Sequence, residues 1–97
     1  MLKHVVIWKV REPAQRAANV AAIRHALEGL RGRIPGLLAI EVGADIGYDN
    51  SGQDVVLYAE FADRAALDVY QDHPLHLDAK AVIGPLLTNR VAVDWVV

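Results

Sequence analysis

The stretch LKHVVIWKV, residues 2–10, is rich in Val and Ile and predicts a β-strand. Alternation along a strand divides its side chains between two faces, with His4, Val6, Trp8 and Val10 on one and Val5 and Ile7 on the other. Both faces are largely apolar, so each needs a covering layer. The strand therefore predicts a sheet that is buried on both sides.

The rest of the chain supplies the elements of one such sheet. Apolar residues spaced by three and four predict an amphipathic helix through Val20, Ile23, Leu27, Leu30 and Ile34. Pro35 and Gly36 end it. Further strands are predicted at 37–43 (with Leu38, Ile40 and Val42 on one face), 54–61 and 90–97, further helices at 63–72 and 74–83, and a polar loop that could serve as a lid at 43–54.

This β-α-β-β-α-β order predicts an α+β fold of the ferredoxin-like type. We expect a four-stranded antiparallel sheet with the helices on one face. The other face would carry Val5, Ile7, Val91, Val93, Trp95 and Val97. An apolar face of this kind is unstable in water, so we predict a homodimer in which two sheets pack face to face.

Composition limits the functional classes. The chain has 97 residues, which corresponds to a single domain over residues 1–97. Its net charge of −2 and lack of a basic cluster argue against nucleic-acid binding. It has no cysteine, which excludes disulfides, thiol catalysis and thiolate metal sites. No apolar run approaches the length of a membrane span and no signal peptide is apparent, so a cytoplasmic location is expected.

The segment YQDHPLHLDAK, residues 70–80, holds two of the four histidines. Pro74 suits the first position of a helix, which makes His73 the N-cap. His76 then shares a helix face with Ala79 and Ile83 and points toward apolar surroundings. Burial and the positive helix N-terminus should both lower the pKa of His76. A neutral imidazole facing a cavity suits a general base, although a hydrogen-bonded core histidine is the simpler alternative.

Other polar residues are open to two interpretations. Asp94 on the last strand could reach His4 on the first and fix its tautomer, or it could bond neighbouring backbone at the strand end. His25 is predicted to be a surface residue. No metal site is expected, because His73 and His76 diverge at the helix start and few further ligands are at hand.

Several of these features together resemble one family. The opening K-H, the IPG of residues 34–36, the third strand ending in E-F, the Y-x-x-H-P-x-H segment and the final V-D-W are similar to the stress-responsive A/B barrel (Dabb) family. The resemblance covers residues 3–94 and implies a homodimer that forms an α+β barrel. It implies no cofactor, and most members have no assigned reaction.

The resemblance also implies a site. In a plant polyketide cyclase of this family a tyrosine and a histidine close a ring by aldol condensation, and they match Tyr70 and His76. His76 would then be the base, and Tyr70 would donate a hydrogen bond to the substrate carbonyl or enolate. The pocket between sheet and helices would be lined by His4, Val6, Trp8, Ile23, Leu27, Ile40, Leu57 and Asp94. Ile23 and Leu27 replace aromatic residues of that relative, so a long alkyl polyketide does not carry over.

Three functions follow as hypotheses. The first is a dimeric protein that binds a small, largely apolar molecule without turnover. The second is a cofactor-free cyclase, isomerase or lyase that moves protons next to a carbonyl with His76 and Tyr70. The third is a structural role in stress physiology without catalysis.

Overall fold

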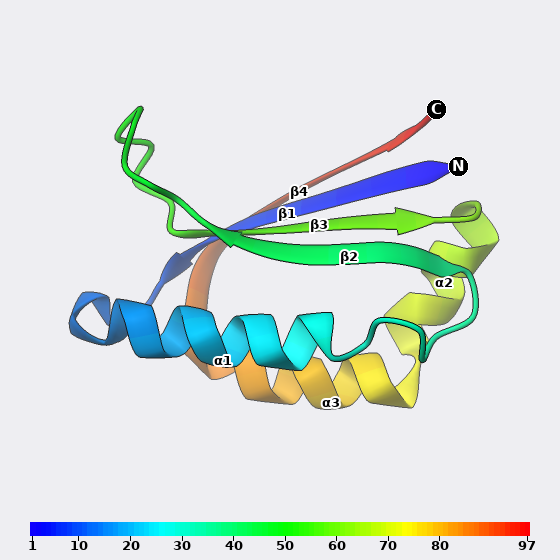
Figure 1. Ribbon diagram of the computed structural model, residues 1–97, viewed down its shortest axis with the longest axis horizontal. Helices are drawn as coiled ribbons and strands as arrows, with labels where there is room; N and C mark the ends of the chain where they lie inside the picture. Colours follow the sequence, from blue (N-terminus) through cyan, green and yellow to red (C-terminus); the bar gives the residue numbers. More distant parts are fainter.

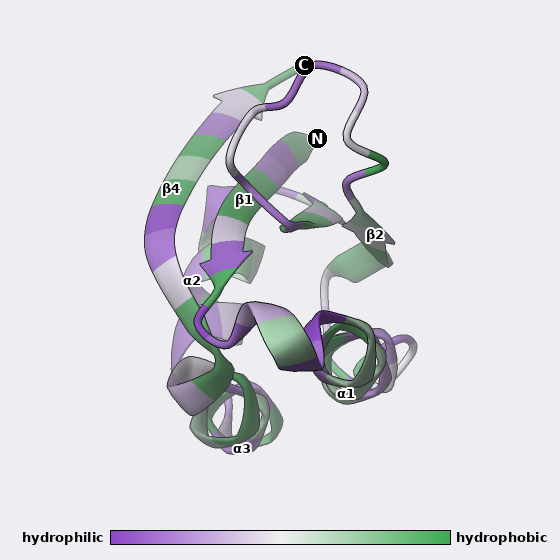
Figure 2. Ribbon diagram, turned by 90° about the vertical axis from the view of Figure 1, so that its left-hand side faces the viewer, coloured by the Kyte–Doolittle hydropathy of each residue, from purple (hydrophilic) through white to green (hydrophobic).

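Four antiparallel strands form one sheet in the order β2-β3-β1-β4 in the computed structural model, which describes residues 1–97 (Figure 1). The elements are β1 (Leu2–Val10), α1 (Arg16–Glu28), β2 (Leu37–Ala44), β3 (Val55–Phe61), α2 (Arg64–Asp72), α3 (Pro74–Ile83) and β4 (Leu87–Val96). The helices lie on one side of the sheet, with α1 and α3 side by side (Figures 1 and 2). The predicted ferredoxin-like α+β fold is confirmed.

The core lies between this sheet and the helices. Every second residue of β1 from Leu2 to Trp8 is buried, as the alternation predicts. In register, Val6 lies between Leu57 of β3 and Ala92 of β4. Val20, Ile23 and Leu27 of α1 pack onto this layer from the helix side. The stripe of apolar residues along α1 therefore covers the middle of the sheet.

Side-chain caps begin both α2 and α3, and Pro74 separates the two helices. The carboxylate of Asp63 accepts a hydrogen bond from the amide of Ala66 at 2.9 Å and caps α2. Pro74 cannot continue that helix, because the residue before a proline avoids the α region, and His73 is extended with φ −66° and ψ 134°. Its Nδ1 accepts from the amide of Leu75 at 3.1 Å. His73 is therefore the N-cap of α3, as predicted.

Two predicted boundaries are wrong. The first helix ends at Glu28 and not near Ile34, because Gly29 caps it and is followed by turns. Leu30 and Ile34 are nevertheless buried in those turns. The last strand begins at Leu87, three residues before the predicted start, because its first residues pair with the end of β1 beyond a bulge.

The prediction for Leu38 is also wrong. A bulge between Leu37 and Ala39 shifts the register of β2 against β3. Leu37, Ile40 and Val42 are buried, whereas the side chain of Leu38 is 58% exposed. The extra residue turns Leu38 away from the core, so it does not share the buried face of Ile40 and Val42 that simple alternation predicts.

The side of the sheet opposite the helices has no cover within the chain. It carries the exposed residues Val91, Val93 and Trp95 of β4. Figure 2 shows hydrophobic and hydrophilic bands alternating along this strand. The loop between β2 and β3 extends past this open side, away from the helices (Figure 1), so it does not lie over the space between sheet and helices as a lid would. No helix has the length and apolar character needed to cross a membrane.

Candidate functional site

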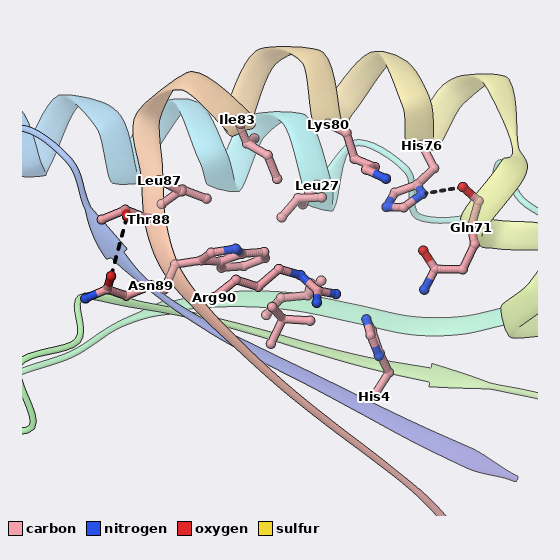
Figure 3. Close-up of a pocket in the computed structure, with 14 residues that line it drawn as sticks. His4, Leu27, Gln71, His76, Lys80, Ile83, Leu87, Thr88, Asn89 and Arg90 are labelled. Carbon is pink, nitrogen blue, oxygen red and sulfur yellow. Dashed lines mark hydrogen bonds between the residues drawn. The ribbon is translucent and has the colours of Figure 1, made fainter.

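A cavity of about 380 Å³ lies between the sheet and α3 (Figure 3). Apolar side chains of β1, β3, α1 and α3 form much of its wall, and polar side chains of α2, α3 and β4 form the rest. The lining residues are His4, Val6, Trp8, Leu27, Leu57, Gln71, His76, Lys80, Ile83, Gly84, Leu87, Thr88, Asn89 and Arg90. The exposed edge strand β4 has no helix packed over most of its length, which leaves this side of the cavity open.

His76 enters the cavity from the first turn of α3. Its side chain is buried, and its Nδ1 lies 3.3 Å from the carbonyl oxygen of Gln71 (Figure 3). A carbonyl only accepts, so Nδ1 carries the proton and Nε2 keeps a free lone pair. Burial lowers the pKa of His76, and the positive charge of Lys80 lowers it further, against the opposing effect of the carbonyl contact. The neutral, basic form is thus favoured near pH 7.

His4 rises into the cavity from β1. It pairs in register with Asp94 of β4, and its Nδ1 donates a hydrogen bond to the Asp94 carboxylate. The contact with His4, and not with neighbouring backbone, is therefore the alternative that the structure supports for Asp94. In the neutral form of the ring, the proton on Nδ1 leaves Nε2 of His4 as an acceptor. The site thus contains two buried imidazoles, each with its tautomer fixed through Nδ1.

Tyr70 lies behind His76 and does not line the cavity. Its ring stacks on the imidazole of His76 at a centroid distance of 3.9 Å and meets Phe61 edge-on at 4.9 Å. The side chain is fully buried, and its hydroxyl has no hydrogen-bond partner. Burial raises the pKa of Tyr70 to about 12, so the phenol stays protonated. Tyr70 therefore supports the ring of His76 from behind and does not itself reach the cavity.

The family follows from the whole sequence. A model of the stress responsive A/B barrel domain (Dabb) matches residues 2–97. The chain belongs to the Dabb family. No curated protein matches this Dabb chain.

Solved structures agree with this assignment. A dimeric protein of unknown function with a ferredoxin-like fold from Bacteroides fragilis is 26% identical, with a TM-score of 0.86, and the match covers 97% of the Dabb chain and 93% of that protein. A dimeric ferredoxin-like protein of unknown function from Thermobifida fusca is 29% identical, with a TM-score of 0.79 and coverage of 99% and 90%. An antibiotic biosynthesis monooxygenase is 21% identical, with a TM-score of 0.77 and coverage of 100% and 98%, and shares the fold alone.

The cavity of the Dabb chain contains only part of the predicted site. Of the predicted site residues, those that line the cavity are His4, Val6, Trp8, Leu27, Leu57 and His76. Ile23 and Ile40 do not line it, because both are packed within the core. Asp94 stands behind His4 and reaches the cavity only through that ring, and Tyr70 stands behind His76 in the same way.

Several lining residues were missed by the sequence reasoning, chiefly Gln71, Lys80 and Arg90. Signals for two of them were present. Lys80 is four residues after His76, which places both on one face of α3. Arg90 is four residues before Asp94 and so shares its strand face. The chain has no group of three or more His, Cys, Asp or Glu arranged to hold a metal ion.

Proposed function

We propose that this Dabb chain binds a small, largely apolar molecule in the cavity between sheet and helices. The observation that carries the proposal is the cavity itself, about 380 Å³ with two buried histidines in its wall. A volume of this size is within the range of small-molecule sites. Val6, Trp8 and Leu57 offer an apolar surface, and Nε2 of His76 offers an acceptor nitrogen.

The protein acts as a homodimer in this proposal. The open side of the sheet is apolar, with Val91 51% exposed, Val93 58% and Trp95 41%. An apolar surface of this kind is unfavourable in water. The similar proteins from Bacteroides fragilis and Thermobifida fusca are described as dimeric. Face-to-face packing through Val5, Ile7, Val91, Val93 and Trp95 would bury these residues.

Filling the cavity tests the binding role. Binding of 1-naphthoate and 1-naphthamide is measured by calorimetry for the wild-type protein, for Leu57→Phe, which adds bulk inside the cavity, and for Leu77→Phe, which adds the same bulk on the exposed side of α3. We expect Leu57→Phe to lose most of the binding and Leu77→Phe to keep it, with both variants dimeric. Equal binding by Leu57→Phe contradicts the proposal.

A cofactor-free enzyme is the second candidate, and the two imidazoles favour it. Nε2 of His76 is an unprotonated acceptor at the cavity, and Nε2 of His4 is one in the neutral form of its ring, a suitable arrangement for taking a proton from carbon next to a carbonyl. His76 would act as base, and Asp94 would hold His4 in its tautomer. Tyr70 would position the ring of His76, or donate to the substrate if its hydroxyl reached the cavity.

Proton abstraction can be measured without knowing the substrate. The protein is mixed with 1-acetonaphthone in D₂O, and loss of the methyl proton signal next to the carbonyl is followed by NMR. Catalysis predicts faster exchange with the wild-type protein, slower exchange with His76→Ala, and unchanged exchange with the surface control His25→Ala. If the probe binds and exchange is no faster than with His76→Ala, the protein is a binding protein toward this class of compound.

A further inference from the structure

The charges around the cavity are of one sign. Lys80 and Arg90 are the only fixed charges among the lining residues, and no Asp or Glu lines the cavity. The chain as a whole has more acidic than basic residues, 12 against 10. The cavity is thus lined by positive charge although the chain as a whole has a net negative charge. Asp94, which stands behind His4, is already paired with that ring.

Lys80 has no anionic partner within the chain. The three ion pairs of the structure join other residues. The positions three and four residues from Lys80 are His76, Leu77 and Ile83 on α3 and Gly84 just after it, none of which is acidic. The side chain extends from the helix toward His76 and the cavity (Figure 3). Its charge is felt by His76, whose pKa it helps to lower.

Arg90 approaches the cavity from the opposite wall. It lies on β4, on the strand face that also carries Ala92 and Asp94. Figure 3 shows its guanidinium directed into the cavity, above the strands that form the floor. This guanidinium makes no hydrogen bond or ion pair in the chain, in contrast to Arg11, Arg16, Arg24 and Arg31, each of which donates to a backbone or side-chain oxygen.

We propose that the ligand is a small organic carboxylate, held with its anionic group between Lys80 and Arg90 and its apolar body against Trp8. The inference rests on the proposed binding function and deepens it. The planar guanidinium presents paired N–H donors that match a carboxylate, and an ammonium on the other side supplies a second charge. The apolar wall limits the ligand to one charged end and an aromatic or aliphatic remainder.

The arrangement also orders the ligand relative to the two histidines. With the carboxylate at Lys80, the adjoining carbon atoms lie beside His76, because these two side chains are neighbours on α3. The neutral ring of His76 presents an acceptor nitrogen and would repel a carboxylate weakly, which leaves the cations to fix its position. A bound anion would in turn offset the effect of Lys80 on His76.

Matched acids and amides test the charge directly. Affinities are measured by calorimetry for three pairs of probes: benzoate and benzamide, 1-naphthoate and 1-naphthamide, and octanoate and octanamide. For at least one pair we expect the acid to bind about tenfold or more tightly than the amide, as for the loss of one charge-assisted hydrogen bond. Lys80→Gln and Arg90→Gln should each remove most of this preference, whereas Arg33→Gln, an exposed cation outside the cavity, should retain it.

The outcomes separate the two proposals. Equal affinity for acid and amide overturns the carboxylate proposal while the binding function stands. An acid preference that survives both Lys80→Gln and Arg90→Gln also overturns it, because the anion is then held elsewhere. Binding of neither member of any pair overturns the binding function itself. Circular dichroism of each variant, at the same protein concentration, verifies that the fold is retained.

Discussion

Replacing Tyr70 by Phe removes one oxygen atom from the core and leaves the packed ring in place. The side chain is 0% exposed and its hydroxyl has no hydrogen-bond partner. A buried polar group without a partner costs about 1–3 kcal/mol relative to its hydrated state in the unfolded chain. Tyr70→Phe should therefore raise the free energy of unfolding by about 1–3 kcal/mol. Most core substitutions act in the opposite direction.

The stacking geometry supports an increase in stability for Tyr70→Phe. The contacts of Tyr70 with His76 and Phe61 are made by the ring faces and edges, at 3.9 and 4.9 Å between centroids, and Phe keeps both. For a domain of this size each kcal/mol corresponds to a shift of about 4–8 °C in Tm. Turnover or ligand binding should be unchanged if Tyr70 acts only by supporting the His76 ring.

Urea unfolding followed by circular dichroism measures the effect. Protein concentration is held constant, because the stability of a dimer depends on it. Tyr48→Phe is the matched control, since Tyr48 is 86% exposed in the loop and its substitution should leave stability unchanged. A Tyr70→Phe variant that is less stable than the wild-type protein by 1 kcal/mol or more (roughly one hydrogen bond) would show that the hydroxyl has a partner and that the reasoning is wrong.

Three further predictions concern pH, assembly and the backbone. Burial lowers the folded-state pKa of His76 below the unfolded value of about 6.5, so the unfolded chain binds the proton first. The free energy of unfolding should then decrease as the pH falls from about 6.5 to the folded pKa. His76→Gln should abolish this decrease. An NMR titration that gives His76 a pKa above the reference of about 6.5 contradicts the prediction. Val93→Lys should convert the dimer to monomers in sedimentation experiments, and a dimer that persists at micromolar concentration argues against the open sheet side as the interface. Gly36→Ala should destabilise the fold by about 2 kcal/mol or more, because Gly36 has φ +80° and an added Cβ would lie 2.5 Å from the Cβ of Ala66; unchanged thermal unfolding would show that the turn adapts.

Much of the fold could be predicted because local signals agree with the tertiary structure. The alternation in β1 identifies its two faces, and the position of Pro74 fixes both the N-cap at His73 and the inward direction of His76. Local patterns fail where a single bulge shifts which residues of a strand face the core. The bulge beside Leu38 is a property of the pairing between β2 and β3, which the sequence of β2 alone does not reveal.

The site was less predictable, because it depends on which strand lies at the edge. Arg90 reaches the cavity only because β4 pairs with β1 and no helix packs over most of it. Charged residues on an edge strand and on an exposed helix face, such as Arg90 and Lys80, usually point to solvent. Tyr70 was expected at the cavity because it matches the tyrosine of the related plant polyketide cyclase, whereas the turn between α2 and α3 stacks it behind the imidazole.

Histidine-selective NMR during a titration with 1-naphthoate tests most directly whether the cavity is the functional site. The four histidines report on separate places, since His4 and His76 line the cavity while His25 is exposed on α1 and His73 caps α3. We predict saturable shifts of the ring signals of His4 and His76, with those of His25 and His73 unchanged. Saturable binding that leaves His4 and His76 unmoved would contradict the account.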